Sequence, residues 1–167
     1  MGDNLLTSFP QSIGGMKSIK MLNAFNNHLT GLPESIGSLQ SLNDLILGEN
    51  EITTIPDTLG LLPNLQRLEL GENQLRTLPE SIGDLHALQV LKVDANLLAS
   101  LPETLGNLTS LEELCLEFNQ LTSLPVTIRH LTSLNWLDIS GNPLEPLPKS
   151  LLKWIRDLEA RECAVTR

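Results

Sequence analysis

Aliphatic and polar residues alternate in short stretches that return at a constant spacing along this chain. In Leu68-Glu69-Leu70 a polar residue separates two leucines, which predicts a short strand that buries both leucines and exposes the residue between them. The same pattern returns every 23 residues, and two other residue types keep the period without a slip. Asparagine stands at positions 4, 27, 50, 73, 96, 119 and 142, and proline at positions 10, 33, 56, 79, 102, 125 and 148. The chain is therefore an array of one module, and the module decides the fold.

The module reads L-x-x-L-x-L-x-x-N-x-L-x-x-L-P-x-x-I-G-x-L. Asn73 follows the strand where the chain turns inward, and its amide can both donate and accept hydrogen bonds there, so a column of asparagines should form a hydrogen-bonded ladder. Pro79 suits the first position of a short helix, and Glu80 places a carboxylate beside its positive end. Gly83 permits the turn back toward the next strand. Each coil should therefore contribute one strand and, opposite it, a short helical or 3₁₀ segment.

A single coil cannot bury its own leucines, so neighbouring coils must stack, with parallel strands about 4.8 Å apart. The helical side of each coil needs more room than the strand side, which bends the stack. We therefore expect an α/β solenoid over residues 1–148, made of seven periods of which the first is partial. It should be curved, with a parallel β-sheet on the concave face and short helical or 3₁₀ segments on the convex face.

The repeat pattern stops near the C-terminus, where Asp157 takes the place of the next expected leucine. Apolar residues then recur at helical spacing, at Leu151, Trp154, Ile155 and Leu158. The spacing predicts an amphipathic helix that caps the array within residues 149–160, with Trp154 in a leucine position of the core. Residues 161–167 are expected to be a tail.

The N-terminal period lacks most of its strand, and no capping helix precedes it. Ends of repeat arrays expose apolar cross-sections and usually need caps. Either the chain is a fragment of something longer, which we favour, or a partner covers this end. We expect a monomer, or weak association through the open N-terminal end.

The module resembles the leucine-rich repeat, specifically its 23-residue cytoplasmic type, over residues 4–148. It is similar to the repeats of the Ras-suppressor group and of LAP scaffold proteins such as Erbin, Scribble and densin. In those relatives the concave face typically binds another protein, often a small GTPase or a component of polarity or phosphatase signalling. The resemblance implies a noncatalytic module or scaffold for protein–protein interaction.

Composition narrows the class of partner. Hydrophobic residues make up 41% of the chain and aromatic residues only 3%, so one core of leucine and isoleucine is expected. The net charge of −9 disfavours nucleic acid and anionic membrane surfaces and favours basic protein segments. The sequence has neither a signal peptide pattern nor a long apolar run, which predicts no membrane insertion. Cys115 and Cys163 form no disulfide framework, and a reducing, cytoplasmic setting fits best.

No constellation for catalysis, metal binding or a cofactor is found in the sequence. His28, His86 and His130 fall at different offsets in the module, without metal-ligand or triad spacing. Phosphate-binding glycine motifs are missing, because the glycines belong to the period. The acidic neighbours Glu113 and Glu117 should raise the pKa of Cys115 and keep it from acting as a nucleophile. We therefore expect a protein that is not an enzyme.

Thirty positions vary between the first strand leucine and the asparagine of six modules, and all of them should point out of the concave sheet. They carry nine acids and three bases, so this face accounts for −6 of the total charge of −9. Three of the five aromatic residues, Phe25, Phe118 and Trp136, also belong to it. Large apolar side chains that face solvent are typical of contact sites.

The strongest local combination lies around Trp136. It should sit beside Glu113 of the preceding strand and diagonal to Cys115, with Val90 two strands away in its own column. The candidate partner-binding residues are Trp136, Glu113, Cys115, Val90, Glu112, Glu117, Asp138, Lys92 and Glu69. An aromatic anchor surrounded by carboxylates suits a partner that offers an apolar side chain next to Arg or Lys. The alternative is that Trp136 shields neighbouring strands and the acids maintain solubility.

A second functional hypothesis is a recognition domain cut from a larger signalling enzyme, such as a kinase, cyclase or ubiquitin ligase. The missing first strand keeps this reading open. A consensus-built repeat without a natural ligand is a third reading, and the irregular residues of the concave face weigh against it.

Overall fold

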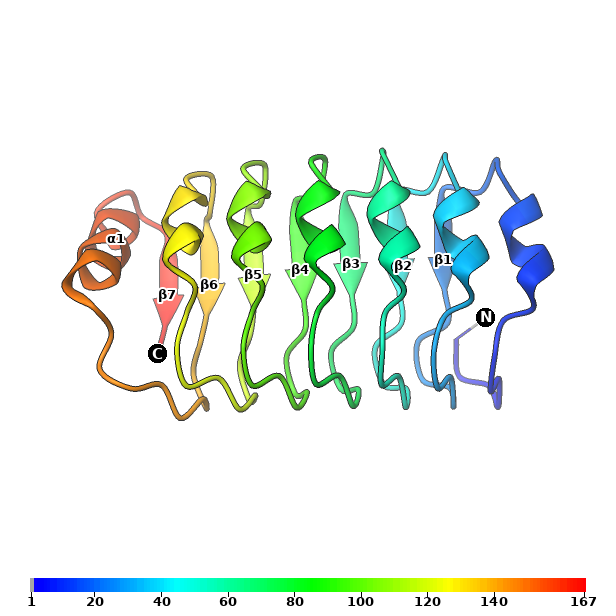
Figure 1. The fold of residues 1–167 in the computed structure, drawn as a ribbon, viewed down its shortest axis with the longest axis horizontal. Helices are drawn as coiled ribbons and strands as arrows, with labels where there is room; N and C mark the ends of the chain where they lie inside the picture. The colour runs from blue at the N-terminus through cyan, green and yellow to red at the C-terminus, as the bar shows by residue number, and fades with distance from the viewer. Residues whose placement is uncertain (1) are drawn as a thin grey trace.

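The computed structural model describes residues 2–167 as a stack of similar coils, each with a strand on one side and a short helix on the other (Figure 1). The strands are β1 (Met21–Asn23), β2 (Asp44–Ile46), β3 (Arg67–Glu69), β4 (Val90–Lys92), β5 (Glu113–Cys115), β6 (Trp136–Asp138) and β7 (Ala164–Thr166). The 3₁₀ helices are η1 (Gln11–Gly15), η2 (Glu34–Ser38), η3 (Asp57–Leu61), η4 (Glu80–Asp84), η5 (Glu103–Asn107) and η6 (Val126–His130), and one α-helix, α1, spans Lys149–Glu159.

The seven strands form one parallel sheet in chain order, from β1 to β7. The middle leucines of neighbouring strands are in register, so that Leu68 pairs with Leu45 and with Leu91. The sheet is open and uncurled, and the predicted solenoid with its parallel sheet, 3₁₀ helices and C-terminal helix is confirmed. We refer below to the outward side of this sheet as the sheet face.

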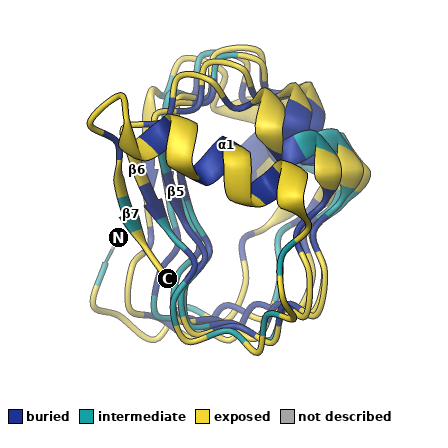
Figure 2. Cartoon of the chain, turned by 90° about the vertical axis from the view of Figure 1, so that its left-hand side faces the viewer, coloured by how far each residue is buried: buried dark blue, intermediate teal, exposed yellow. Residues whose placement is uncertain are grey.

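The core lies inside each coil, between the sheet and the helices. In the view along the stack, the strands on one side and the helices on the other enclose this space, and both carry buried residues (Figure 2). Both aliphatic residues of each strand pattern are buried, as Leu68 and Leu70 illustrate. The aliphatic residue of each 3₁₀ helix closes the core from the other side, as Ile82 does in η4. This burial is the main favourable contribution to folding of such an array.

The asparagine column joins consecutive coils through the backbone, and not through asparagine pairs. The Oδ1 atom of Asn73 accepts a hydrogen bond from the backbone N–H of Ile52 in the preceding coil at 2.9 Å. Its Nδ2 atom donates to the carbonyl of Leu47 in that coil at 3.0 Å and to Leu70 in its own coil at 3.1 Å. The predicted ladder thus exists, but each rung links an amide to main-chain groups of the turn, and a carbonyl such as that of Leu47 accepts hydrogen bonds from two successive asparagines.

The proline and glycine of the module act differently from the expectation. Pro79 has extended backbone angles, with φ −68° and ψ 151°, and lies one residue before η4, so that Glu80 and not Pro79 begins the helix. Gly83 lies within η4 and makes no special turn. A Cβ atom at Gly83 would lie 2.4 Å from the carbonyl oxygen of Thr104. Glycine is required there because successive helices pack with their backbones in contact.

A left-handed residue stands immediately before each asparagine of the column, which the sequence pattern did not predict. The residues with positive φ at this position are Asp3, Asn26, Glu49, Glu72, Ala95, Phe118 and Gly141. Only one of them is glycine, and side chains such as that of Phe118 (φ 55°) disfavour this region. The repeated turn imposes the angle on whichever residue occupies the position.

The C-terminal helix forms as predicted, and α1 buries Trp154, Ile155 and Leu158 against the last coil. Residues 161–167, expected to be a tail, instead contain β7, in which Val165 pairs with Leu137 of β6. The repeat pattern does not indicate this strand, because only one aliphatic residue, Val165, stands where the module has two leucines. The division of the chain into an array, a cap and a tail remains a prediction.

The N-terminal end of the stack carries an apolar depression of about 330 Å³. Leu6, Phe9, Ile13 and Met16 are among the residues that line it. Along residues 2–167, the only helices are too short or too polar to cross a lipid bilayer.

Candidate functional site

The sheet face is built by the outward residues of three-residue strands and by the turn residues that follow them. Because side chains alternate along a strand, the middle leucine points inward and its two neighbours point outward. Two outward columns result. One contains Arg67, Val90, Glu113 and Trp136, and the other contains Glu69, Lys92, Cys115 and Asp138.

Trp136 is exposed on this face as predicted. It pairs with Glu113 of β5 on one side and with the small residue Ala164 of β7 on the other. Its exposed fraction is 44%, whereas that of Trp154 in the cap is 6%. Val90 lies two strands away in the same column and is half-buried. The indole therefore stands at the C-terminal end of the face with one side left uncovered.

Cys115 corrects the expectation that every outward position is accessible, since this residue is buried. Its short side chain lies between Lys92 and Asp138 of the adjacent strands, and its Sγ is 3.6 Å from the Oε1 of Glu113. Burial, together with the charges of Glu117 and Glu113, raises the pKa of Cys115 to about 12. The thiol supports its neighbours and is not accessible to a partner.

Two basic residues of the face are paired with acids, Lys92 with an acid of the adjacent strand β5 and Arg67 with an acid of its own strand β3. The Nζ atom of Lys92 lies 2.9 Å from the Oε1 of Glu113, and Arg67 Nη1 lies 2.8 Å from the Oε1 of Glu69. Burial alone would lower the pKa of Lys92, but the hydrogen bond and charge of Glu113 and the charge of Glu69 raise it. Glu69, Lys92 and Glu113 thus form a connected group in the middle of the sheet.

Further carboxylates surround Trp136 and Cys115. The backbone carbonyl of Glu112 accepts hydrogen bonds from the N–H groups of Asn135 and Trp136, which places this exposed glutamate at the start of β5. Asp138 accepts hydrogen bonds from Ser140 through its Oδ1. The Oε2 atom of Glu117 is buried and has no hydrogen-bond partner within residues 2–167. Burial and the charges of Asp94 and Asp138 raise the pKa of Glu117.

A depression of about 130 Å³, which the repeat pattern did not predict, lies on the N-terminal half of the face. Two glycines form its floor, and larger side chains lean over them. The ring of Phe25 lies over Gly48, where an added Cβ would be 3.3 Å from Cδ2, and the carboxylate of Asp94 lies over Gly71, where it would be 2.6 Å from Oδ1. The sequence signal for this depression is glycine at the same outward position of two consecutive coils, at Gly48 and Gly71.

The same depression is acidic. Its other lining residues include Glu49, Glu69 and Glu72, with Lys92 as the one base. Burial, and then the charges of Glu72 and Glu69, raise the pKa of Asp94. An aromatic ring and several carboxylates around one hollow can receive a cationic side chain.

Residues with catalytic potential do not converge. His28, His86 and His130 are exposed on separate coils, and His28 Nδ1 lies 2.8 Å from Glu51 Oε1. No group of three or more His, Cys, Asp or Glu side chains within the described part of the chain is arranged to hold a metal ion. Both cysteines are free.

Comparison with known proteins gives matches over most of the array. Residues 44–120 match the family described as leucine-rich repeat region, and residues 133–154 match a second leucine-rich repeat family. No curated protein matches the chain. A leucine-rich repeat protein of Leptospira interrogans is 34% identical, with a TM-score of 0.89 over 98% of this chain and 40% of its own.

Two plant structures are also similar. The ectodomain of the Arabidopsis thaliana membrane receptor kinase GASSHO1/SCHENGEN3, solved with Casparian strip integrity factor 2, is 33% identical, with a TM-score of 0.82 over 90% of this chain and 19% of its own. The Arabidopsis receptor kinase HAESA, solved with the peptide hormone IDA and the co-receptor SERK1, is 30% identical, with a TM-score of 0.73 over 90% and 27%. The chain thus spans less than half the length of each of these three proteins.

Proposed function

Because the chain carries leucine-rich repeats folded as a solenoid, we propose that it is a noncatalytic protein-binding module whose sheet face receives a partner protein. The observation that carries the proposal is the exposure of Trp136 among carboxylates. Tryptophan is over-represented among the residues that dominate binding energy in protein–protein interfaces. The receptor kinases to which the chain is similar were solved with protein or peptide ligands.

The charge of the face defines the chemistry of the partner. Lys92 and Arg67 are already paired with Glu113 and Glu69, whereas Glu112 and Glu117 form no ion pair within residues 2–167. A partner that places Arg or Lys beside an apolar side chain would satisfy these carboxylates and cover the indole of Trp136. Among the predicted site residues, Val90 contributes shape rather than charge, and the buried Cys115 is not part of the contact surface.

The acidic depression near Phe25 supports a second anchor point. A cationic side chain that entered it would stack against the ring of Phe25 and approach the carboxylate of Asp94. It would also lower the raised pKa of Asp94, so binding should release protons at a pH near that pKa. A partner segment that spans the face from Phe25 to Trp136 would run across the strands.

The resemblance of the module to the repeats of known scaffold proteins supports a narrower proposal about the partner and the cellular setting. We propose a scaffold of the Ras-suppressor or LAP type, with a partner in small-GTPase, polarity or phosphatase signalling, in a reducing, cytoplasmic setting. The free thiols of Cys115 and Cys163 are compatible with that setting. The apolar depression at the N-terminal end supports a monomer that associates weakly through this end.

A recognition domain of a larger signalling enzyme is the second candidate. It is favoured by the similarity to receptor kinases, of which the chain matches 19% and 27% of the length. The full reading frame would separate this candidate from a free-standing scaffold. In both cases the sheet face would be the surface that binds the partner.

The test compares binding by wild type, Trp136→Ala and the control Leu61→Ala in pull-downs from matched lysates. Leu61 is an exposed apolar residue on η3, on the opposite side of the coil, so its loss removes apolar surface without touching the sheet face. Partners specific to the wild type should be lost with Trp136→Ala and kept with Leu61→Ala, with melting temperatures unchanged. Retention of every partner by Trp136→Ala would contradict the proposal.

A further inference from the structure

The last helix, α1, lies across the C-terminal end of the stack and turns one face outward (Figure 2). Its buried residues follow the helical spacing i, i+3, i+4 and i+7, at Leu151, Trp154, Ile155 and Leu158. The same spacing shifted by two residues is rotated by about 200° around the helix, to the side opposite the core. It contains Lys149, Leu152, Lys153 and Arg156, and all four are exposed. We refer to these four residues as the cap face.

The cap face carries three cations that the rest of the protein leaves unpaired. Lys149, Lys153 and Arg156 form no ion pair with any residue of the described chain. On the same helix, the carboxylate of Glu159 is already paired with Arg167. The surface at this end is therefore cationic, although the net charge of the chain is −9.

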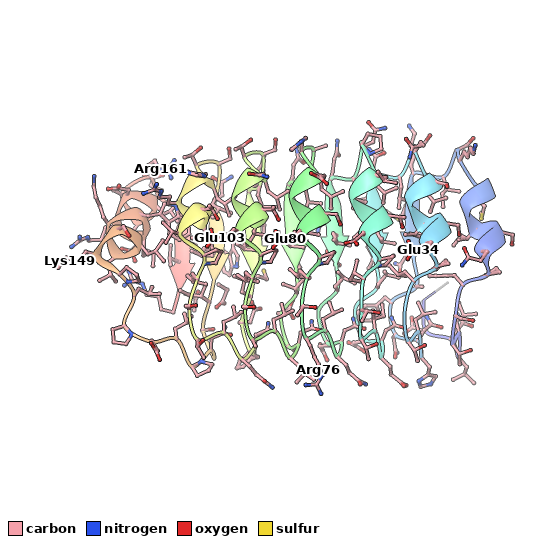
Figure 3. All side chains as sticks on the ribbon, in the orientation of Figure 1. Glu34, Arg76, Glu80, Glu103, Lys149 and Arg161 are labelled. Atoms are coloured by element: carbon pink, nitrogen blue, oxygen red, sulfur yellow. The ribbon has the colours of Figure 1, made fainter. Side chains whose placement is uncertain are left out.

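The charge of the helical side reverses where the array meets the cap. Acids begin the helices along the array, at Glu34, Glu80 and Glu103, whereas Lys149 begins α1 (Figure 3). The last 3₁₀ helix, η6, has no acid in its first turn and two basic residues in its last. The reversal thus begins in η6 and is completed in α1.

An open cavity of about 360 Å³ borders the cap face on the side of η6. Arg129 and His130 of η6 and Lys153 of α1 are among its lining residues, and Asp157 is the one carboxylate. Its fixed charges sum to +1 before any proton on His130. The cationic surface therefore continues from α1 onto η6.

The placement of these cations opposes the stability of α1. A cation near the N-terminus of a helix is disfavoured by the helix dipole, and like charges one turn apart repel each other. Lys149 has both disadvantages, because Lys153 follows it by four residues and the first turn contains no acid. Leu152, which is 39% exposed, adds an apolar side chain between them. Charges and exposed apolar groups that a stable cap does not need are typical of a binding surface.

We propose that the cap face binds an acidic amphipathic helix of a partner protein. The 11 residues of α1 are about 16 Å long, which suits a helix of three turns lying alongside. Acids of that helix would pair with the three cations, and an aliphatic residue between them would cover Leu152. An anionic membrane fits less well, because the net charge of −9 is repelled by it and Leu152 is the one apolar residue of the cap face. The cap face and the sheet face are separate surfaces of opposite charge, so one molecule can hold two partners.

A synthetic helical peptide of three turns serves as the probe, with three glutamates and one leucine at i, i+3, i+4 and i+7. Its control has the same composition in an order that spreads the glutamates around the helix. Fluorescence anisotropy of the labelled peptides should show saturable binding of the first and about tenfold weaker binding of the control. Raising the sodium chloride concentration from about 50 to about 300 mM should weaken the binding several-fold, because exposed charges are screened.

Lys149→Glu separates a loss of binding from a loss of structure. The variant reverses a cation of the cap face, so it should bind the peptide about tenfold more weakly than the wild type. Its melting temperature should nevertheless rise, because an acid then stands at the positive end of α1, four residues before Lys153. Arg156→Glu should weaken binding to a similar extent.

Two control variants should bind the peptide as the wild type does. Arg76→Glu reverses an exposed cation away from α1 (Figure 3). Trp136→Ala changes the sheet face and leaves the cap face intact. A failure of the cap face to bind is therefore distinguishable from a failure of the sheet face.

The proposal is overturned if the two peptides bind equally, or if Lys149→Glu and Arg156→Glu bind the first peptide as tightly as the wild type. Binding of vesicles with about 30% phosphatidylserine, and not of the peptide, would overturn it in favour of a membrane. Dimers that sedimentation detects in the wild type and not in Arg156→Glu, again without peptide binding, would overturn it in favour of a second copy of this chain.

Discussion

Replacing Asn73 by leucine, a side chain of nearly the same shape, removes one rung of the asparagine column. Asn73 is buried, and its Oδ1 is the acceptor for the backbone N–H of Ile52. The carbonyls of Leu47 and Leu70 lose one donor each but keep another, from Asn50 and Asn96 respectively. The orphaned N–H of Ile52 costs about 1–3 kcal/mol and the two shared bonds about 1 kcal/mol together. Extra apolar burial offsets part of this, and we expect a loss of about 2 kcal/mol in the free energy of unfolding.

Urea unfolding followed by circular dichroism measures this loss, and Asn142→Leu is the matched control. Asn142 makes the same set of hydrogen bonds, from Leu121 N–H and to Leu116 and Ile139, but it is only half-buried. Water can replace part of its bonding, so its loss should cost less than half as much. A change below about 0.5 kcal/mol for Asn73→Leu, or equal losses at both positions, would show that the column does not act through buried backbone groups.

Four further changes test other features of the array. Gly83→Ala should destabilise the protein by about 2–3 kcal/mol in urea unfolding, because the new Cβ would meet a carbonyl oxygen of the next coil; a neutral result would refute close helix packing. Ala95 has a left-handed backbone (φ 48°), so Ala95→Gly should raise the free energy of unfolding by about 0.5 kcal/mol. Ala99 has no positive φ, so Ala99→Gly should not stabilise the protein. Glu117→Gln should raise the melting temperature at pH 7, because the raised pKa of this carboxyl means that its charged form is disfavoured in the folded state. The difference in melting temperature between this variant and the wild type should disappear as the pH falls through that pKa. Native Cys115, with its pKa of about 12, should resist disulfide reagents at pH 8 and react only on unfolding, as a thiol assay in denaturant will show.

The site was predictable to the extent that it depends on alternation along strands. The pairing of Trp136 with Glu113, and the column shared with Val90, follow directly from a repeat of constant length in a parallel sheet. The burial of Cys115 does not follow, because it depends on how far Lys92 and Asp138 lean over a short side chain from adjacent strands. Likewise, glycine in the module indicated a turn, although its role at Gly83 is to admit the backbone of the next coil.

By itself, the sequence determined the period, the order and direction of the strands and the leucine core, because a module that repeats at constant length can bury its apolar residues only against copies of itself. Tertiary structure alone decided what lies between the copies. The depression beneath Phe25 involves residues from four consecutive coils, and the cavity beside α1 involves residues of η6 and of the cap. How exposed these residues are depends on the lengths of their side chains and on the spacing of the helices. The repeat period in the sequence specifies neither.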